Sequence, residues 1–237
     1  MASVDWTTLT NSVSDGVAAS GVSAPFANME GGSDFFYAFN SSTSSILGGM
    51  GKFYDNAGAG AFTLGSSVSG AVVRRASTGS VGYSVFIFTC LGGADTAVNA
   101  TDTAYTLGLS NASPSHIVLA KTTIAAGIPD GSPGTLGILA KSSDIVDLNE
   151  WVHLKLEAIA QSNGDVVINC YRSVTDLDQA VSWQPIDGLD QFVDDVTKIN
   201  SGTSPLTAGR PGFGFSYLAQ NRVAAVSNLQ VSRQTAY

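Results

Sequence analysis

The stretch from residue 150 to residue 172 constrains the fold of this chain more than any other. Its first part, residues 152–160, alternates apolar side chains with polar ones, which is the period of a strand with one buried face. A second alternating run follows at residues 166–171, and Asn163 and Gly164 stand between the two runs. An Asn-Gly pair in this position predicts a β-hairpin.

The loop of this hairpin decides which side chains share a face. A two-residue turn at Asn163 and Gly164 would place Asn169 among the leucines. A three-residue loop at residues 163–165, with Gly164 in the left-handed conformation, moves Asn169 to the opposite face. The reason is that a shift of one residue in the pairing exchanges the two faces of a strand. This loop gathers the apolar side chains on one face: Leu154, Leu156, Ala158, Val166, Ile168 and Cys170. The pattern therefore predicts an antiparallel strand pair with one face in the core.

The composition extends this expectation to the whole chain of 237 residues. Only 13% of the residues are charged, 26 are glycines, and the only glutamates are Glu30, Glu150 and Glu157. Few helix-forming side chains and many turn formers are typical of short strands joined by loops. Further strands are predicted at residues 34–39, 48–54, 70–76, 81–89, 104–109, 116–121, 135–140, 212–217 and 222–231. We predict an all-β fold, a two-sheet antiparallel sandwich or jelly roll with few short helices, one of them within residues 187–196.

The chain shows no sharp change of composition that would mark a linker between domains. Residues 1–30 are interrupted by Gly16, Gly21 and Pro25, and we interpret them as an N-terminal arm. Residues 31–237 are interpreted as a single jelly-roll β-sandwich domain.

Four large apolar side chains are candidate contacts with a partner. Trp6 lies in the arm, and the strand predicted at residues 81–89 is apolar on both faces, with Tyr83 on one face and Phe86 and Phe88 on the other. A half-buried strand needs only one apolar face, so the second face indicates a central position or an interface with another protein.

Charge and hydrophobicity exclude two classes of partner. The formal net charge is −8, and Arg74 and Arg75 form the only adjacent basic pair, so nucleic acid is not an expected partner. No run of 18 apolar residues is present, so no membrane partner is expected. The first residues have no basic region followed by an apolar stretch, so no secretory leader is predicted and a cytoplasmic origin is expected.

The titratable residues do not form a recognisable catalytic set. Glu150 and Glu157 are an odd number of positions apart, which places them on opposite faces of a regular strand. The only histidines, His116 and His153, both fall in strand patterns, with His153 on the polar face. Nucleophile-elbow and phosphate-loop motifs are absent from the sequence, so we predict a protein that is not an enzyme.

No cofactor is expected, with a structural calcium ion as the alternative. Asp95, Asn99 and Asp102 share one predicted loop, and Asp176 and Asp178 share another, and such oxygen groups suit calcium. The two cysteines, Cys90 and Cys170, fall in apolar strands and are expected to be buried free thiols.

Three segments resemble the concanavalin A-like, or laminin G-like, jelly roll. The first is Trp-Val-His-Leu-Lys-Leu from residue 151, followed by Asn-Gly-Asp and by Val-Val-Ile-Asn-Cys-Tyr up to residue 171. The second is Gly-Arg-Pro-Gly-Phe-Gly-Phe at residues 209–215, and the third is the run at residues 223–231. This resemblance implies a jelly roll whose last strand returns beside the first. The resemblance indicates the fold and does not indicate the function.

The whole chain is also similar in style to structural proteins of tailed bacteriophages. The similarity lies in a composition rich in Gly, Ser and Ala and poor in Glu, and in the segments at residues 36–40 and 104–110. It implies a non-enzymatic component of a bacteriophage virion, such as a capsid decoration protein or a tail- or fibre-associated protein. Such a protein would assemble in the host cytoplasm and contact other virion proteins and copies of itself.

The alternative function is a carbohydrate-binding, lectin-like module, which a particle would display for adhesion to host glycans. Sugar sites use exposed aromatic side chains beside Asn and Asp, and Tyr171, Trp183 and Tyr217 are the candidate glycan contacts. A third hypothesis is a divergent glycoside hydrolase, which the shortage of glutamates disfavours because hydrolysis uses a pair of carboxyl groups.

Overall fold

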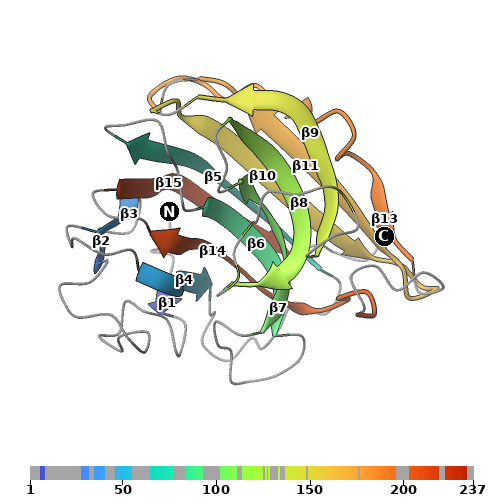
Figure 1. Ribbon diagram of the computed structural model, residues 1–237. Coiled ribbons are helices and arrows are strands. Elements are labelled where there is room, and N and C mark those ends of the chain that lie inside the picture. Colours follow the sequence, from blue (N-terminus) through green and yellow to red (C-terminus); the bar gives the residue numbers. More distant parts are fainter. Residues whose placement is uncertain are drawn as a thin grey trace.

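The computed structural model describes most of the chain as strands and their connections. The described residues are 6–8, 28–31, 35–40, 46–54, 65–76, 84–92, 102–110, 114–124, 126, 128, 133, 137–147, 149–175, 177–195, 203–218 and 222–233. Their strands form two antiparallel sheets that stack face to face (Figure 1). Within these ranges no helix has the length and apolar character that crossing a membrane requires.

One sheet has seven strands. In spatial order they are β1 (Trp6–Thr8), β4 (Ile46–Tyr54), β14 (Gly209–Leu218), β6 (Ser84–Gly92), β7 (Thr103–Leu109), β8 (Ser115–Thr123) and β9 (Ile138–Val146).

The other sheet holds the remaining strands. In spatial order they are β12 (Gln184–Pro185), β11 (Val166–Ser173), β10 (Val152–Ala160), β5 (Ser66–Ala76), β15 (Arg222–Arg233), β3 (Phe35–Asn40) and β2 (Asn28–Gly31), and β13 (Phe192–Asp194) also pairs with β11. The last strand, β15, therefore lies between β5 and β3 near the start of the chain. This arrangement is the concanavalin A-like sandwich that the sequence predicts.

The main hydrophobic core lies between the two sheets. Every second residue of the central strands points into it, as the alternation of the sequence predicts. Its fully buried members include Val68, Val72, Val85, Ile87, Leu107, Leu119, Val152, Leu154, Leu156, Ile168, Cys170, Phe213, Phe215 and Val226.

The hairpin of β10 and β11 keeps the predicted faces, with a different loop. Leu156 lies opposite Cys170, so the apolar positions of both strands share the core face. Gly164 has a φ of 91°, in the left-handed region, as predicted. The backbone N–H of Gln161 donates to the carbonyl of Asp165 at 2.8 Å, so the three-residue loop is residues 162–164 and not 163–165. This change shifts the pairing by two residues, which leaves the faces unchanged.

Two predicted elements are corrected by the structure. The helix expected within residues 187–196 is a single turn, in which the N–H of Asp190 donates to the carbonyl of Ile186 at 3.1 Å, followed by the short strand β13. The strand expected at residues 135–140 is β9, which begins at Ile138 and continues to Val146 through polar residues. The division into an arm and a domain stays a prediction, although β1 and β2 show that parts of residues 1–31 pair within the sheets.

A second hydrophobic cluster lies on the outer face of the seven-stranded sheet. Phe86 and Phe88 are fully buried there, against the connection between β8 and β9, which contributes Ile124 and Ile128. The N–H of Ile128 donates to Ser84 Oγ at 3.1 Å and fastens this connection to β6. The chain itself therefore covers the second apolar face of β6, and neither phenylalanine reaches a surface that a partner could contact.

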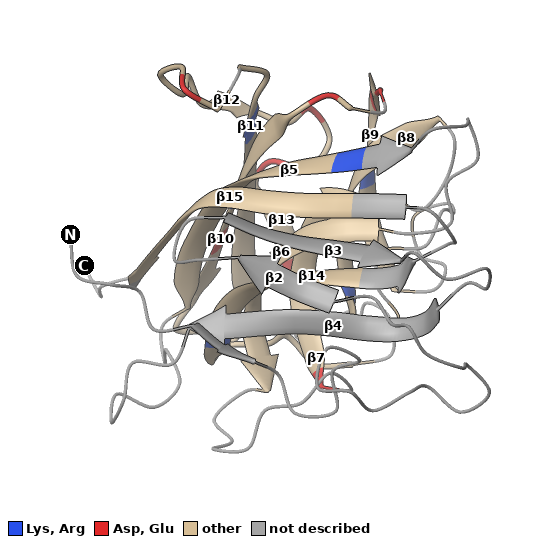
Figure 2. Ribbon diagram, turned by 90° about the vertical axis from the view of Figure 1, so that its left-hand side faces the viewer, with Lys and Arg blue, Asp and Glu red and all other residues tan. Residues whose placement is uncertain are grey.

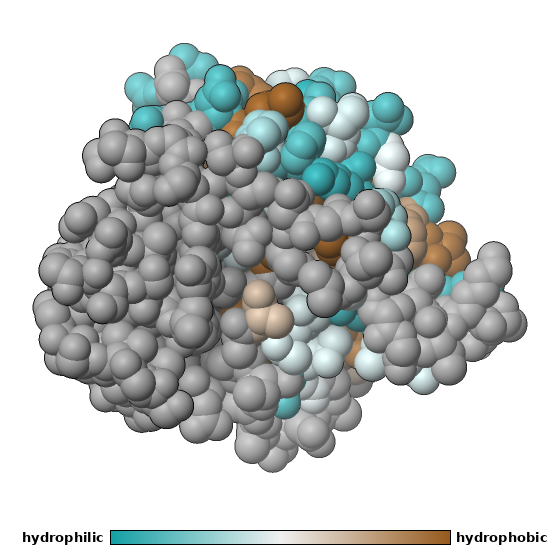
Figure 3. Space-filling view, in the orientation of Figure 1, coloured by the Kyte–Doolittle hydropathy of each residue, from teal (hydrophilic) through white to brown (hydrophobic). Residues whose placement is uncertain are grey.

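The described surface carries only scattered large apolar side chains. The exposed ones are Ile145, Val174, Val181 and Val193, each more than a third exposed. On the face seen in Figure 3, apolar residues (brown) form small separate spots among polar ones (teal) wherever described residues are in view. Contiguous apolar patches mark interfaces with other proteins, and this view shows none among the described residues.

Candidate functional site

The loop between β11 and β12 crosses the outer face of the eight-stranded sheet. The side-chain amide of Asn228, on β15, donates a hydrogen bond of 3.0 Å to the carbonyl of Leu177 in this loop. Strands β10 and β5 lie between β11 and β15, so the loop reaches over both of them. At the end of the loop, the N–H of Ser182 is 3.3 Å from Ser173 Oγ on β11. The loop therefore forms a wall above the sheet.

Asn228 occupies a special place in β15. The pairing of β15 with β5 shifts between Ser227 and Gln230, and Asn228 has a φ of 53°. A bulge of this kind re-aims side chains, and Asn is among the few residues that tolerate the left-handed conformation. The bulge thus turns the amide of Asn228 outward to hold the loop.

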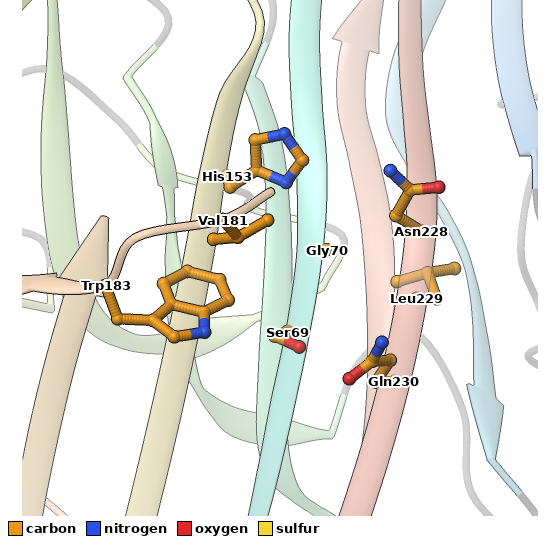
Figure 4. Close-up of a pocket in the computed structure, with 8 residues that line it drawn as sticks. All are labelled: Ser69, Gly70, His153, Val181, Trp183, Asn228, Leu229 and Gln230. Atoms are coloured by element: carbon orange, nitrogen blue, oxygen red, sulfur yellow. The ribbon is translucent and has the colours of Figure 1, made fainter. Parts of the chain in front are cut away.

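Two adjoining cavities lie between the loop and the sheet. The larger, of about 400 Å³, is lined by Ser69, Gly70, His153, Val181, Trp183, Asn228, Leu229 and Gln230. Figure 4 shows Val181 and Trp183 on one side of it and the β15 residues on the other, with Ser69 and Gly70 between them. The smaller, of about 250 Å³, is lined by Ser67, Ser69, Lys155, Trp183, Gln230, Val231 and Ser232. The cavities share Ser69, Trp183 and Gln230, and we call them together the outer groove.

Polar side chains form a row across the floor of the outer groove. Tyr171, Lys155, Ser69 and Gln230 lie opposite one another on β11, β10, β5 and β15, and β-sheet neighbours in such a row are in contact distance. Lys155 Nζ forms a 2.6 Å ion pair with Oε1 of Glu157 and lies 5.1 Å from the centre of the Tyr171 ring. Burial, followed by the nearby Glu157 carboxylate, raises the pKa of Tyr171 above its usual value.

His153 lines the larger cavity and is almost fully covered. The polar face of β10 predicts a solvent-exposed side chain, but His153 is only 2% exposed. Its Nε2 atom has no hydrogen-bond partner among the described residues. Alternation assigned His153 to the correct face of the strand but gave no sign of the loop above it. The other histidine, His116, is half-buried, with Nδ1 3.1 Å from the carbonyl of Ser142.

Two of the three predicted glycan contacts lie at this face, and the third does not. Trp183 lines both cavities, and Tyr171 lies in the row beside Lys155. Tyr217 is on β14, in the other sheet, and its side chain lies outside the described part of the structure, as does that of Trp6 on β1. Tyr83 lies outside the described residues. The sequence did not single out Ser69, Asn228 or Gln230, which carry no local signal of a site.

Acidic groups are absent from the described lining of the outer groove. Glu150 lies in the turn before β10, where its Oε2 accepts a 3.1 Å hydrogen bond from the N–H of Asp147, and Glu157 is paired with Lys155. Asp178 and Asp187 are exposed in loops, and Figure 2 shows several acidic residues (red) in the loops along the upper edge of the molecule. The described lining therefore has no pair of carboxyl groups for acid–base chemistry.

The described residues include no group of three or more His, Cys, Asp or Glu side chains that could hold a metal ion. The calcium hypothesis stays a prediction, since Asp95, Asn99 and Asp176 lie outside the described residues. Cys90 and Cys170 are free and buried, and burial raises the pKa of Cys90 to about 12.

Comparisons with known proteins show which solved structures share this fold. No family model matches the chain, and no curated protein sequence matches it. Solved structures do match. The carbohydrate-binding module CBM66 from Bacillus subtilis has a TM-score of 0.53 and 11% sequence identity, covering 98% of this chain and 97% of that one. The exoplasmic/lumenal domain of VIP36, with Ca²⁺ and Man3GlcNAc bound, has a TM-score of 0.50 and 10% identity, covering 89% and 83%.

A third matching structure is an enzyme. The PL-14 alginate lyase from Aplysia kurodai has a TM-score of 0.50 and 11% identity, and the match covers 88% of this chain and 87% of that one. At such identities the likeness shows the fold alone, which is the jelly roll that lectin-like domains share.

The predicted role as a structural component of a bacteriophage virion is wrong on this comparison. The matching structures include a carbohydrate-binding module and a domain solved with a bound glycan, and they favour the alternative reading of the sequence. The composition that resembles phage proteins is equally typical of a sandwich with many turns, so it does not separate the two functions.

Proposed function

We propose that this chain is a non-enzymatic carbohydrate-binding module and that glycans bind in the outer groove. One observation carries the proposal. The indole of Trp183 forms a wall directly beside a row of hydroxyl, amide and amino groups supplied by three neighbouring strands, in a cavity that is open to a ligand.

The chemistry of the outer groove suits a sugar. A sugar ring has faces of C–H groups, which pack on an aromatic ring, and an edge of hydroxyl groups, which both donate and accept hydrogen bonds. Trp183 supplies the aromatic surface. Ser69 and Gln230 supply donors and acceptors, and Lys155 supplies donors. The larger cavity falls within the range of roughly 300–1,000 Å³ that is usual for ligand sites.

The groove is also held in shape before a ligand arrives. Its floor consists of β10, β5 and β15, whose other faces pack in the main core, and the hydrogen bond from Asn228 to Leu177 fixes the loop. A preformed site orders few groups on binding and loses less affinity for that reason.

The non-enzymatic part of the proposal is supported by the lining of the outer groove. No Asp or Glu is among the described residues that line its two cavities, whereas glycoside hydrolysis uses a pair of carboxyl groups. Glu157, which lies beside the row, is engaged by Lys155.

A glycan array with a matched pair of tryptophan variants tests this function. Trp183→Ala removes the aromatic wall, and loss of a central aromatic contact typically costs about 2 kcal/mol or more, which is roughly a 30-fold loss of affinity. Trp151→Ala is the control, because Trp151 is also partly exposed but lines a separate cavity of about 230 Å³ with Asn149 and Gln179. Binding that Trp151→Ala keeps and Trp183→Ala loses is expected. Silence across the array, or equal loss in both variants, would show that the proposal is wrong.

A further inference from the structure

We infer that the outer groove binds a neutral glycan segment of two or more sugar residues, one stacked on Trp183 and its neighbour hydrogen-bonded to Nε2 of His153. The inference rests on the proposed function and adds the ligand class and the residue that reads it.

The length of the groove is set by the register of its floor. At one end His153 lies opposite Ala71, and at the other end Glu157 lies opposite Ser67. The four residue-to-residue steps between these levels on β10 span about 13 Å at the usual rise of a strand. Ser67 and Ser232, which are paired on β5 and β15, close the far level. A groove of this length exceeds a single sugar ring.

Trp183 lies where the two cavities of the groove meet. It lines both cavities, and so do Ser69 and Gln230 on the floor across from it. A ligand that fills both halves must therefore pass the indole, with a sugar ring against Trp183 and the next ring in one of the two cavities (Figure 4).

His153 gives the larger half its chemical preference. The side chain lines this cavity and is 2% exposed, and no described residue forms a hydrogen bond with its Nε2 atom. An unpaired buried nitrogen destabilises the free protein, so a ligand group that pairs with it gains affinity. The χ2 torsion of a histidine is soft, so a small turn of the ring aims Nε2 into the cavity. A hydroxyl group both donates and accepts, so it pairs with Nε2 in either tautomer of the ring.

The charges of the groove favour a neutral ligand. Lys155, the one lysine among the described residues that line the groove, already forms an ion pair with Glu157 at 2.6 Å. The described residues around His153 include no cluster of metal ligands. A carboxylate-bearing sugar would therefore have to compete with Glu157 for Lys155.

The length and charge parts of the inference are tested by calorimetric titration with defined probes. These are gluco-, manno-, galacto-, xylo- and fructo-oligosaccharides and uronic-acid oligosaccharides, each from one to about six units. For the neutral series that binds best, we expect an affinity gain of about tenfold or more from one unit to two, then a plateau. Equal affinity for the monosaccharide, or a preference for uronic acids, would overturn the inference while leaving glycan binding intact. Absence of binding to every probe would overturn both proposals.

The role of His153 is tested with variants in the same titration. His153→Phe removes the unpaired nitrogen, so we expect about tenfold weaker binding, the equivalent of one hydrogen bond, together with a urea midpoint that is unchanged or raised. His153→Gln keeps a terminal amide and should recover part of the affinity. If the His153→Phe variant does not fold, the affinity of the His153→Gln variant is compared with that of the wild type instead. His116→Phe, the matched control, should bind as the wild type does. Unchanged affinity in both His153 variants would remove His153 from the site.

Discussion

A buried ion pair between the two sheets provides the sharpest test of the structure. Lys121 on β8 and Asp194 on β13 have fully buried side chains, and Nζ lies 2.6 Å from Oδ2. Lys121 also donates to the carbonyl of Thr203 at 2.7 Å, and the hydroxyl of Tyr105 donates to Oδ2 of Asp194 at 2.5 Å. The N–H of Leu206 in turn donates to the Tyr105 hydroxyl at 2.9 Å. The network therefore fastens the segment after β13 to the seven-stranded sheet.

The Lys121→Met variant tests how much this buried ion pair contributes to stability. Methionine keeps an apolar side chain of similar length, so the main change is the loss of the positive charge that Lys121 places beside the buried Asp194 carboxylate. Breaking a buried pair in this way costs about 3–5 kcal/mol, which is a large fraction of the roughly 5–15 kcal/mol that stabilises a typical domain. Replacing both partners should cost much less, because a pair of apolar groups has no charge to desolvate.

A double-mutant cycle measures this coupling by urea unfolding. The four proteins are the wild type, Lys121→Met, Asp194→Leu and the double variant, with the free energy of unfolding determined for each. We expect each single variant to lose about 3 kcal/mol or more and the double variant to lose less than the sum of the two. A loss under about 1 kcal/mol in Lys121→Met, or strictly additive losses, would mean that these charges are solvated and that the described burial of the pair is wrong.

Two further predictions concern a buried thiol and a glycine. Burial raises the pKa of Cys90 from 9.0 to about 12, so the unfolded chain releases this proton at lower pH than the folded chain. Stability should therefore fall as the pH rises from about 9 towards 12, by up to about 1.4 kcal/mol per pH unit for this thiol, and a Cys90→Ala variant should show a shallower fall in urea midpoint. A slope that Cys90→Ala leaves unaltered would contradict this account. Gly65 has a φ of 93°, and a Cβ there would lie 1.9 Å from the carbonyl oxygen of Ala158, whereas a Cβ on Gly188, at φ 76°, would meet nothing within 4 Å. Thermal unfolding should show Gly65→Ala to be destabilised by roughly 3 kcal/mol or more and Gly188→Ala by about 1–2 kcal/mol; similar losses in the two variants would refute the steric argument.

Local alternation was sufficient to predict the fold class and the faces of the central hairpin. Leu154 and Leu156 mark a buried face, and Ile168 and Cys170 share it in either of the two three-residue loops, 162–164 and 163–165, because a shift of two residues leaves the faces unchanged. The loop was predicted one residue too late, at 163–165 instead of 162–164. An Asn-Gly pair indicates a turn but does not determine which residues on either side of it form the last pair of the hairpin. Strand β9 was cut short because its polar residues, Lys141 to Asp144, look like a loop when read without their neighbours.

What the sequence could not show is which segments cover which faces. Phe86 and Phe88 suggested a partner protein, but they are buried in a cluster with Ile124 and Ile128 of the connection between β8 and β9, a stretch without strand periodicity. His153 lies on the predicted face, yet a loop that begins more than twenty positions later covers it. The groove joins Ser69, Trp183 and Gln230 from distant parts of the chain. The pairing of β5 with β15 brings Ser69 beside Gln230, and the loop held by Asn228 brings Trp183 over them.

The wall of the groove and its floor differ in how much they contribute to the stability of the fold. Trp183 and Val181 belong to a connection whose described residues are half-exposed or exposed, while the floor strands carry the core on their other side. In a protein that binds glycans as proposed, substitutions in that connection would alter which glycans bind without loosening the sandwich. Changes to the floor would disturb recognition and folding together. A library confined to residues 177–183 would therefore explore new selectivities from a scaffold that tolerates the exchange.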